Sequence, residues 1–150
     1  MRIVTYCCYT ILLIPVLLSG TAFAQDNELE VTIDILEPSE EPGGMAPGIQ
    51  YLEEEMSRSP LKFQSYLNLA SAFRTIPLGK EETINFKLRR YLKLVIIPIK
   101  VSPQTVQFSL KIWADKHLIL DTDLSLVKSG TVMVGVAGKP DLIIAISEGF

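Results

Sequence analysis

Apolar and polar side chains alternate along much of this chain, with the period of two that marks a half-buried β-strand. Alternation or an unbroken apolar run predicts strands at 29–35, 63–72, 83–88, 91–101, 105–113, 117–126, 131–136 and 142–147. Pro98 falls inside one run, and we expect it at a bulge or a sheet edge because proline cannot donate to the ladder. In 117–126 the alternation places four leucines on one buried side, namely Leu118, Leu120, Leu124 and Leu126.

Turn residues separate these segments at roughly ten-residue intervals, which is typical of antiparallel all-β folds. We therefore expect a mainly β protein, a single antiparallel β-sandwich or small barrel of about seven or eight strands. Ile49, Leu52 and Met56 recur at helical spacing, so one short helix over 49–57 is expected near the start. The hairpin from Ser129 to Ser147 is interpreted as one more strand pair of the core, for which no membrane is needed.

The first 24 residues have the features of a secretory signal peptide. Arg2 supplies a positive start, 11–18 is a short apolar run, and Ala22-Phe-Ala24 is a cleavage pattern, which makes Gln25 the first mature residue. The alternative is a retained membrane anchor. The small residues before the cleavage point favour removal, after which no membrane-spanning segment is expected.

Both cysteines, Cys7 and Cys8, lie inside this segment. The mature chain is then free of disulfides, thiolate nucleophiles and cysteine metal ligands. Export without disulfides favours a protein of a Gram-negative bacterium, either periplasmic or extracellular.

Charge divides the mature chain into two parts. Residues 25–55 contain ten acidic side chains and no basic one, whereas 56–128 contain twelve basic and five acidic. We assign 25–48 to an N-terminal strand followed by an acidic linker rich in Pro and Gly, and 49–150 to the β-rich domain. The acidic part is either a solvated arm or tether, or a segment that covers a basic face.

The most concentrated basic cluster consists of Lys87, Arg89, Arg90 and Lys93. We predict these four residues as candidate contacts with a partner protein. Nucleic acid is rejected as a partner because no nucleic-acid motif or interleaved aromatic residues accompany the cluster and because exported proteins rarely meet nucleic acid.

Catalytic chemistry is poorly represented. His117 is the one histidine of the chain, and the carboxylates of Glu53, Glu54 and Glu55 do not converge on a helix. Asp121 and Asp123 lack the rest of a calcium loop. We predict no catalytic residue, no cofactor and no metal, and therefore a protein that is not an enzyme.

The segments Phe63-Gln-Ser-Tyr-Leu-Asn-Leu69 and Leu142-Ile-Ile-Ala-Ile146, with Leu124-Ser-Leu126 and Gly130-Thr131 before the latter, resemble small exported β-rich proteins of unknown function from Gram-negative bacteria. That resemblance implies a β-sandwich-like fold and no catalytic residues. The final hairpin is also similar to a motif of secretins, in which a glycine-x-threonine segment leads to paired glycines and a later strand is rich in Leu and Ile. Gly130, Thr131 and Gly135 match this motif, but Val136 stands where a second glycine is expected.

These patterns favour a non-enzymatic envelope protein, a protein-binding or accessory module whose partner is another envelope protein, such as a secretion or pilus component. The alternative is a periplasmic protein that binds a small ligand, either in its interior or in a groove beside Trp113 and Tyr91. Oligomeric state is left open by the sequence.

Overall fold

The computed structural model describes residues 27–61 and 63–149, so the expected signal peptide lies outside the described residues. The strands are β1 (Glu28–Ser39), β2 (Gly44–Met45), β3 (Ser65–Pro77), β4 (Glu82–Lys87), β5 (Tyr91–Val101), β6 (Thr105–Ala114), β7 (His117–Val127), β8 (Thr131–Val136) and β9 (Leu142–Glu148). A 3₁₀ turn, η1 (Gln50–Leu52), runs directly into the helix α1 (Glu53–Arg58). The prediction of a mainly β chain with one short helix near its start is confirmed.

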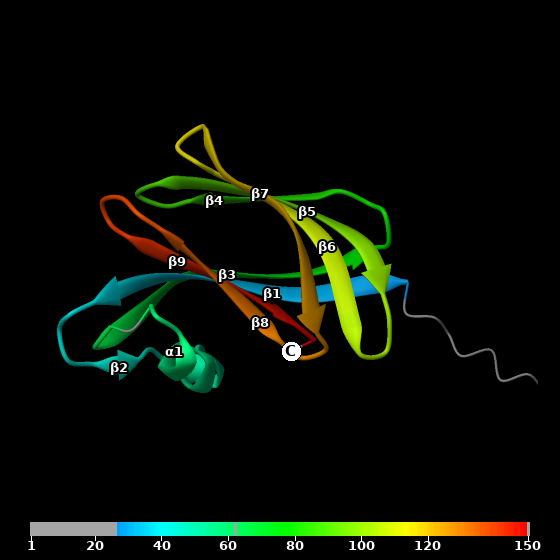
Figure 1. Ribbon diagram of the computed structural model, residues 1–150. Coiled ribbons are helices and arrows are strands. Elements are labelled where there is room, and N and C mark those ends of the chain that lie inside the picture. The colour runs from blue at the N-terminus through cyan, green and yellow to red at the C-terminus, as the bar shows by residue number, and fades with distance from the viewer. Residues whose placement is uncertain (1–26, 62, 150) are drawn as a thin grey trace, which may run out of the picture.

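The strands form two sheets. One has the order β2-β3-β1-β9-β8 and the other the order β4-β5-β6-β7. Neighbouring strands pair antiparallel, with the exception of the two-residue β2, which runs parallel to β3. Figure 1 shows the sheets as two layers, with α1 beside the five-stranded one.

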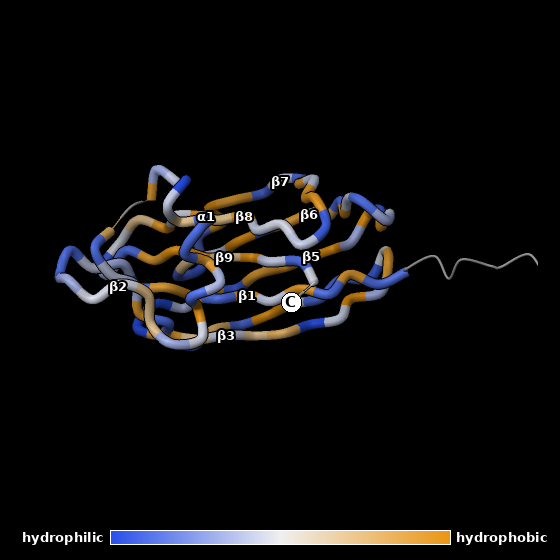
Figure 2. Tube along the Cα trace, turned by 90° about the horizontal axis from the view of Figure 1, so that it is seen from below, coloured by the Kyte–Doolittle hydropathy of each residue, from blue (hydrophilic) through white to orange (hydrophobic). Residues whose placement is uncertain are grey.

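The main core lies between the two sheets because each sheet turns its apolar side chains toward the other. Hydrophobic and hydrophilic residues alternate along the strands in Figure 2. From β1 the inward residues are Leu29, Val31, Ile33 and Ile35, and from β6 they are Val106, Phe108, Leu110 and Ile112, all with no exposed surface. Removal of this apolar surface from water is the dominant favourable term in folding.

A second, smaller core covers the outer face of the five-stranded sheet. Ile49, Leu52 and Met56 from the helical segment pack on that face. Their partners from the sheet are Leu36, Tyr66, Ile143 and Ala145. Strand β9 therefore has a core on each side, and all seven of its residues are buried.

The expected hairpin is formed by β8 and β9, but its second strand is internal because β9 also pairs with β1. The strand of the acidic N-terminal segment is likewise internal to its sheet, because β1 lies between β3 and β9, whereas Glu40 and Glu41 after it are exposed. Pro98 sits beside a register shift between Pro98 and Lys100, which confirms the predicted bulge.

One inward assignment in β7 is wrong. Leu118 was expected beside the other leucines, yet it is 50% exposed. The register shifts between Ile112 and Trp113, so Leu118 lies opposite Trp113 while Leu120 lies opposite Ile112. An inserted residue reverses the side-chain alternation on one side of a bulge, and this turns Leu118 outward.

Phe108 is the largest fully buried side chain of the main core. We expect Phe108→Ala to lower the free energy of unfolding by about 3–5 kcal/mol, because it removes a packed ring and leaves a cavity. Phe73→Ala is the matched control, since Phe73 is 50% exposed. Urea unfolding monitored by circular dichroism measures both, and equal losses would contradict the assignment of the core.

Candidate functional site

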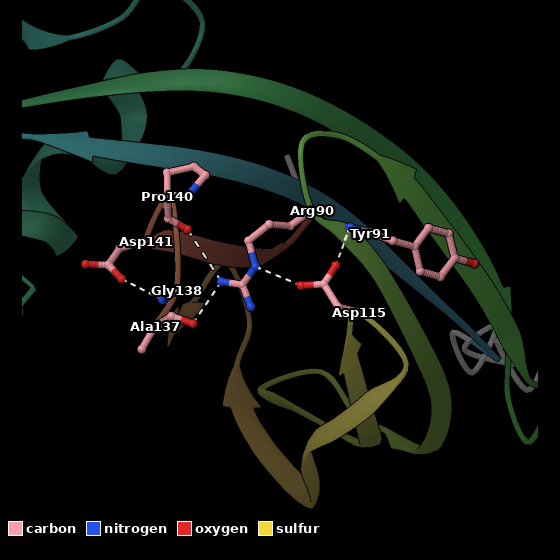
Figure 3. Close-up of polar contacts among 7 residues, drawn as sticks. All are labelled: Arg90, Tyr91, Asp115, Ala137, Gly138, Pro140 and Asp141. Atoms are coloured by element: carbon pink, nitrogen blue, oxygen red, sulfur yellow. Dashed lines mark hydrogen bonds and ion pairs between the residues drawn. The ribbon is translucent and has the colours of Figure 1, made fainter.

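Three hairpin turns meet at one end of the two sheets, on the left of Figure 1. They connect β4 to β5, β6 to β7 and β8 to β9. Arg90, in the first turn, donates from Nε to Asp115 Oδ2 in the second turn at 3.1 Å. It also donates from Nη1 to the carbonyl oxygens of Ala137 and Pro140 in the third turn, at 2.8 and 3.4 Å (Figure 3). A single guanidinium therefore holds all three turns together.

The carboxylate of Asp115 completes this arrangement. Its Oδ1 accepts the backbone N–H of Tyr91 at 3.0 Å, while its own N–H donates to the Tyr91 carbonyl at 2.9 Å. Asp115 and Lys116 have φ values of 50° and 74°, as a two-residue hairpin loop requires. In the third turn, Asp141 Oδ1 accepts the N–H of Gly138 at 2.7 Å.

Glycine is required at position 138 because the Arg90 guanidinium lies directly against the backbone there. A Cβ atom added at this position would lie 2.0 Å from Nη1 and 2.4 Å from Cζ of Arg90. No side chain fits in that space without displacing Arg90.

The four predicted contact residues occupy different environments. The side chain of Arg90 is 13% exposed and its guanidinium is engaged within the protein, which makes Arg90 a structural residue of this end. Lys87 and Arg89 are exposed at the same turn. Lys93 lies further along β5 and is partly buried.

Lys93 belongs to the outer face of the four-stranded sheet. Leu92 and Leu94 enter the main core, so Tyr91 and Lys93 point to the opposite side. There Lys93 Nζ lies 4.8 Å from the ring centroid of Trp113, a cation–π contact, and the Tyr91 hydroxyl donates to Asn85 Oδ1 at 2.6 Å. In the described part of the chain the helical segment packs on the other sheet (Figure 1).

Among residues 27–61 and 63–149, no group of three or more potential metal ligands occurs. Asp121 pairs with Lys111 at 3.1 Å across β6 and β7. His117, Asp121 and Asp123 are exposed, as expected for a solvated strand.

Sequence reasoning missed a buried carboxylate on β1. Asp34 is 2% exposed and accepts hydrogen bonds from the hydroxyls of Tyr51 and Ser71, with the amide of Asn68 at 3.5 Å. Burial, with the hydrogen bond to Asp34, raises the pKa of Tyr51 above its ordinary value of 10.0. The sequence signal for this site is that Asp34 shares the outer face of its strand with the apolar Leu36, which indicates that this face is covered rather than solvated. Asp34 helps to fasten the helical segment to the sheet.

One apolar hollow of about 280 Å³ opens between the segment before β3 and the β8–β9 hairpin. Leu61 and Phe63 line one side of it, and Gly135, Val136 and Leu142 line the other. Among the described residues, no helix is long and apolar enough to span a membrane.

Comparisons with protein-family models, with curated proteins and with solved structures find no match for this chain. The functional conclusion therefore depends on its fold and on the geometry of this end.

We expect Gly138→Ala to destabilise the protein by about 1–3 kcal/mol, because displacement of Arg90 leaves charged and carbonyl groups without their partners. Arg90→Ala removes the same interactions, so the double variant should be no less stable than the worse single variant. Lys139→Ala, in the same turn and exposed, should change stability by less than about 0.5 kcal/mol. The stability of each variant is measured from its urea unfolding midpoint. If the stability losses of Gly138→Ala and Arg90→Ala simply add in the double variant, the proposed contact is contradicted.

Stability should also depend on the ionisation of Asp115. Hydrogen bonds from the Arg90 side chain and the Tyr91 backbone hold the pKa of Asp115 below its ordinary value of 3.8. A carboxylate with a lowered pKa stabilises the fold when the pH is above its pKa in the unfolded state. This stabilisation is lost as the pH falls through its pKa in the folded state. The stability advantage of the wild type over Asp115→Asn should therefore shrink below pH 3.8, as measured by urea unfolding across an acid series. Parallel profiles for the two proteins would contradict this.

Proposed function

We propose that this protein is a non-enzymatic exported envelope protein of a Gram-negative bacterium. In this proposal it is a single antiparallel β-sandwich that binds another envelope protein as an accessory or assembly module. The signal-peptide features of residues 1–24 support export, to the periplasm or the extracellular space. The two-sheet architecture with one shared core supports a compact binding module.

The observation that carries the proposal is the outer face of the four-stranded sheet, which no element of residues 27–61 and 63–149 covers. Trp113 and Tyr91 lie there beside Lys93, and Lys87 and Arg89 flank them at the adjoining turn. Protein interfaces are enriched in Trp, Tyr and Arg, and these residues dominate binding energy when they become desolvated.

The contacts within this face favour binding because they preorganise its side chains before a partner arrives. Lys93 is held over Trp113, Tyr91 is held by Asn85, and Arg90 fastens the adjoining turns. Less side-chain entropy is then lost on association. The basic residues select a partner with an acidic contact surface, such as a component of a secretion or pilus assembly.

Small-ligand binding is the second candidate, and the hollow between Leu61, Phe63 and Gly135 favours it. Its lining is mostly apolar, which suits a small apolar ligand. A Gly135→Leu substitution would fill this hollow without touching Lys93 or Trp113, so it separates the two candidates.

We expect the double variant Lys87→Glu/Lys93→Glu to recover at least about tenfold less cross-linked partner than the wild type, because both charges facing the partner are reversed. The measurement is quantitative cross-linking of the full-length protein in native envelope fractions, followed by mass spectrometry. Lys100→Glu is the matched control, since Lys100 is an exposed lysine of the same strand β5 near its opposite end.

Equal recovery from the double variant and the wild type would contradict this contact surface. Recovery of no partner by any of the proteins, together with a raised melting temperature for the wild type but not for Gly135→Leu in a small-molecule screen, would favour the second candidate.

A further inference from the structure

An exposed aliphatic pair lies where β7 leaves the second turn. Leu118 is 50% exposed and Ile119 is 43% exposed. The register shift between Ile112 and Trp113 is what removes them from the regular alternation. Bulges commonly re-aim side chains near functional sites, and exposed aliphatic side chains that adjoin one another call for a physical explanation.

Four exposed cations lie in or beside the three turns at this end of the sheets. Lys87 and Arg89 come from the first turn, Lys116 from the second and Lys139 from the third. We name these four residues the basic end. Arg89, Lys116 and Lys139 are each next in sequence to a residue of the Arg90 contact set, which contains Arg90, Asp115 and Pro140. Because consecutive Cα atoms are about 3.8 Å apart, the contacts of Arg90 bring these three cations close together.

Few carboxylates oppose the basic end. Asp115 is paired with Arg90, which is not itself one of the four exposed cations. Asp141 accepts the N–H of Gly138 and forms no ion pair among the described residues. The four exposed cations thus face a single carboxylate that lacks an ion-pair partner.

We infer that the basic end docks on the surface of an anionic phospholipid bilayer. Lys87, Arg89, Lys116 and Lys139 then contact lipid phosphates, while Leu118 and Ile119 enter the boundary between headgroups and acyl chains. Clustered Lys and Arg bind anionic membrane surfaces, and apolar side chains add to that binding in proportion to the area they bury. A soluble polyanion would neutralise the cations but would leave the two aliphatic side chains in water, so the bilayer fits better.

This inference goes beyond the proposed function because it concerns a lipid surface. Leu118 lies opposite Trp113, so the docking surface adjoins the protein-binding face. Lys93 and Trp113 lie on the outer face of the four-stranded sheet, whereas Arg89, Lys116 and Lys139 are next in sequence to the residues that join the three turns.

The test is co-sedimentation of the full mature chain with vesicles of phosphatidylglycerol and phosphatidylcholine, and with vesicles of phosphatidylcholine alone. We expect binding to the anionic vesicles only, weakening as salt is added. Lys116→Glu/Lys139→Glu should weaken binding by at least about tenfold, because two attractive charges become repulsive. Leu118→Thr/Ile119→Thr should weaken it by roughly tenfold while the strand is preserved by the β-branched replacement.

Two matched controls keep the result specific. Val127→Thr changes a residue that is 64% exposed at the opposite end of β7, and Lys100→Glu reverses a lysine away from the three turns. Both should bind vesicles like the wild type. Equal urea midpoints for all variants establish that each is folded.

Several outcomes overturn the inference. These are absence of binding to anionic vesicles, equal binding to phosphatidylcholine alone, and loss of binding in the lysine variant with full binding in the Leu118/Ile119 variant, which would identify a polyanion site. Because Lys87 belongs to the basic end, the separate readout for the proposed function is partner recovery by Lys93→Glu alone, which reverses a lysine outside the basic end. Loss of the partner by Lys93→Glu with unchanged vesicle binding would support the protein contact independently of the other vesicle results.

Discussion

The apolar core between the two sheets is the constraint on which the rest of the structure depends. Both sheets have an inward face of aliphatic residues that is stable only when the other sheet covers it. The second core adds a further demand on the five-stranded sheet, because Ile143 and Ala145 of β9 project outward and must be covered by the helical segment. Together the two cores place β9 in the interior, and among the described residues no element covers the outer face of the four-stranded sheet.

The turns at one end are organised by that packing. Once the sheets face each other, the β4–β5, β6–β7 and β8–β9 connections arrive at the same place, and the backbone carbonyls of the third turn need donors. Arg90 supplies them and pairs with Asp115 at the same time, while the absence of a side chain at Gly138 makes room for the guanidinium. Charges that are scattered in the sequence thereby become one basic end beside the aromatic face around Trp113.

Local alternation predicted much of the secondary structure. The strands at 91–101 and 131–136 have the predicted limits, and the bulge at Pro98 follows from the missing N–H of proline. Leu118 was misplaced because Leu118, Ile119 and Leu120 are all apolar, so this run fits either register and only the pairing with β6 decides which side chains turn inward. Arg90 was grouped with exposed cations for a similar reason: its acceptor at Pro140 is 50 positions away in the chain.

The sequence by itself determined the class of the fold, the positions of most strands, the short helix and the basic cluster, because side-chain periodicity and turn chemistry act between near neighbours. The tertiary structure decided which cations stay in water and which one becomes internal, and it decided that Asp34 is buried beneath Tyr51 while Lys93 covers Trp113. These outcomes depend on contacts between segments far apart in the chain, which form only when the two sheets close over their common core.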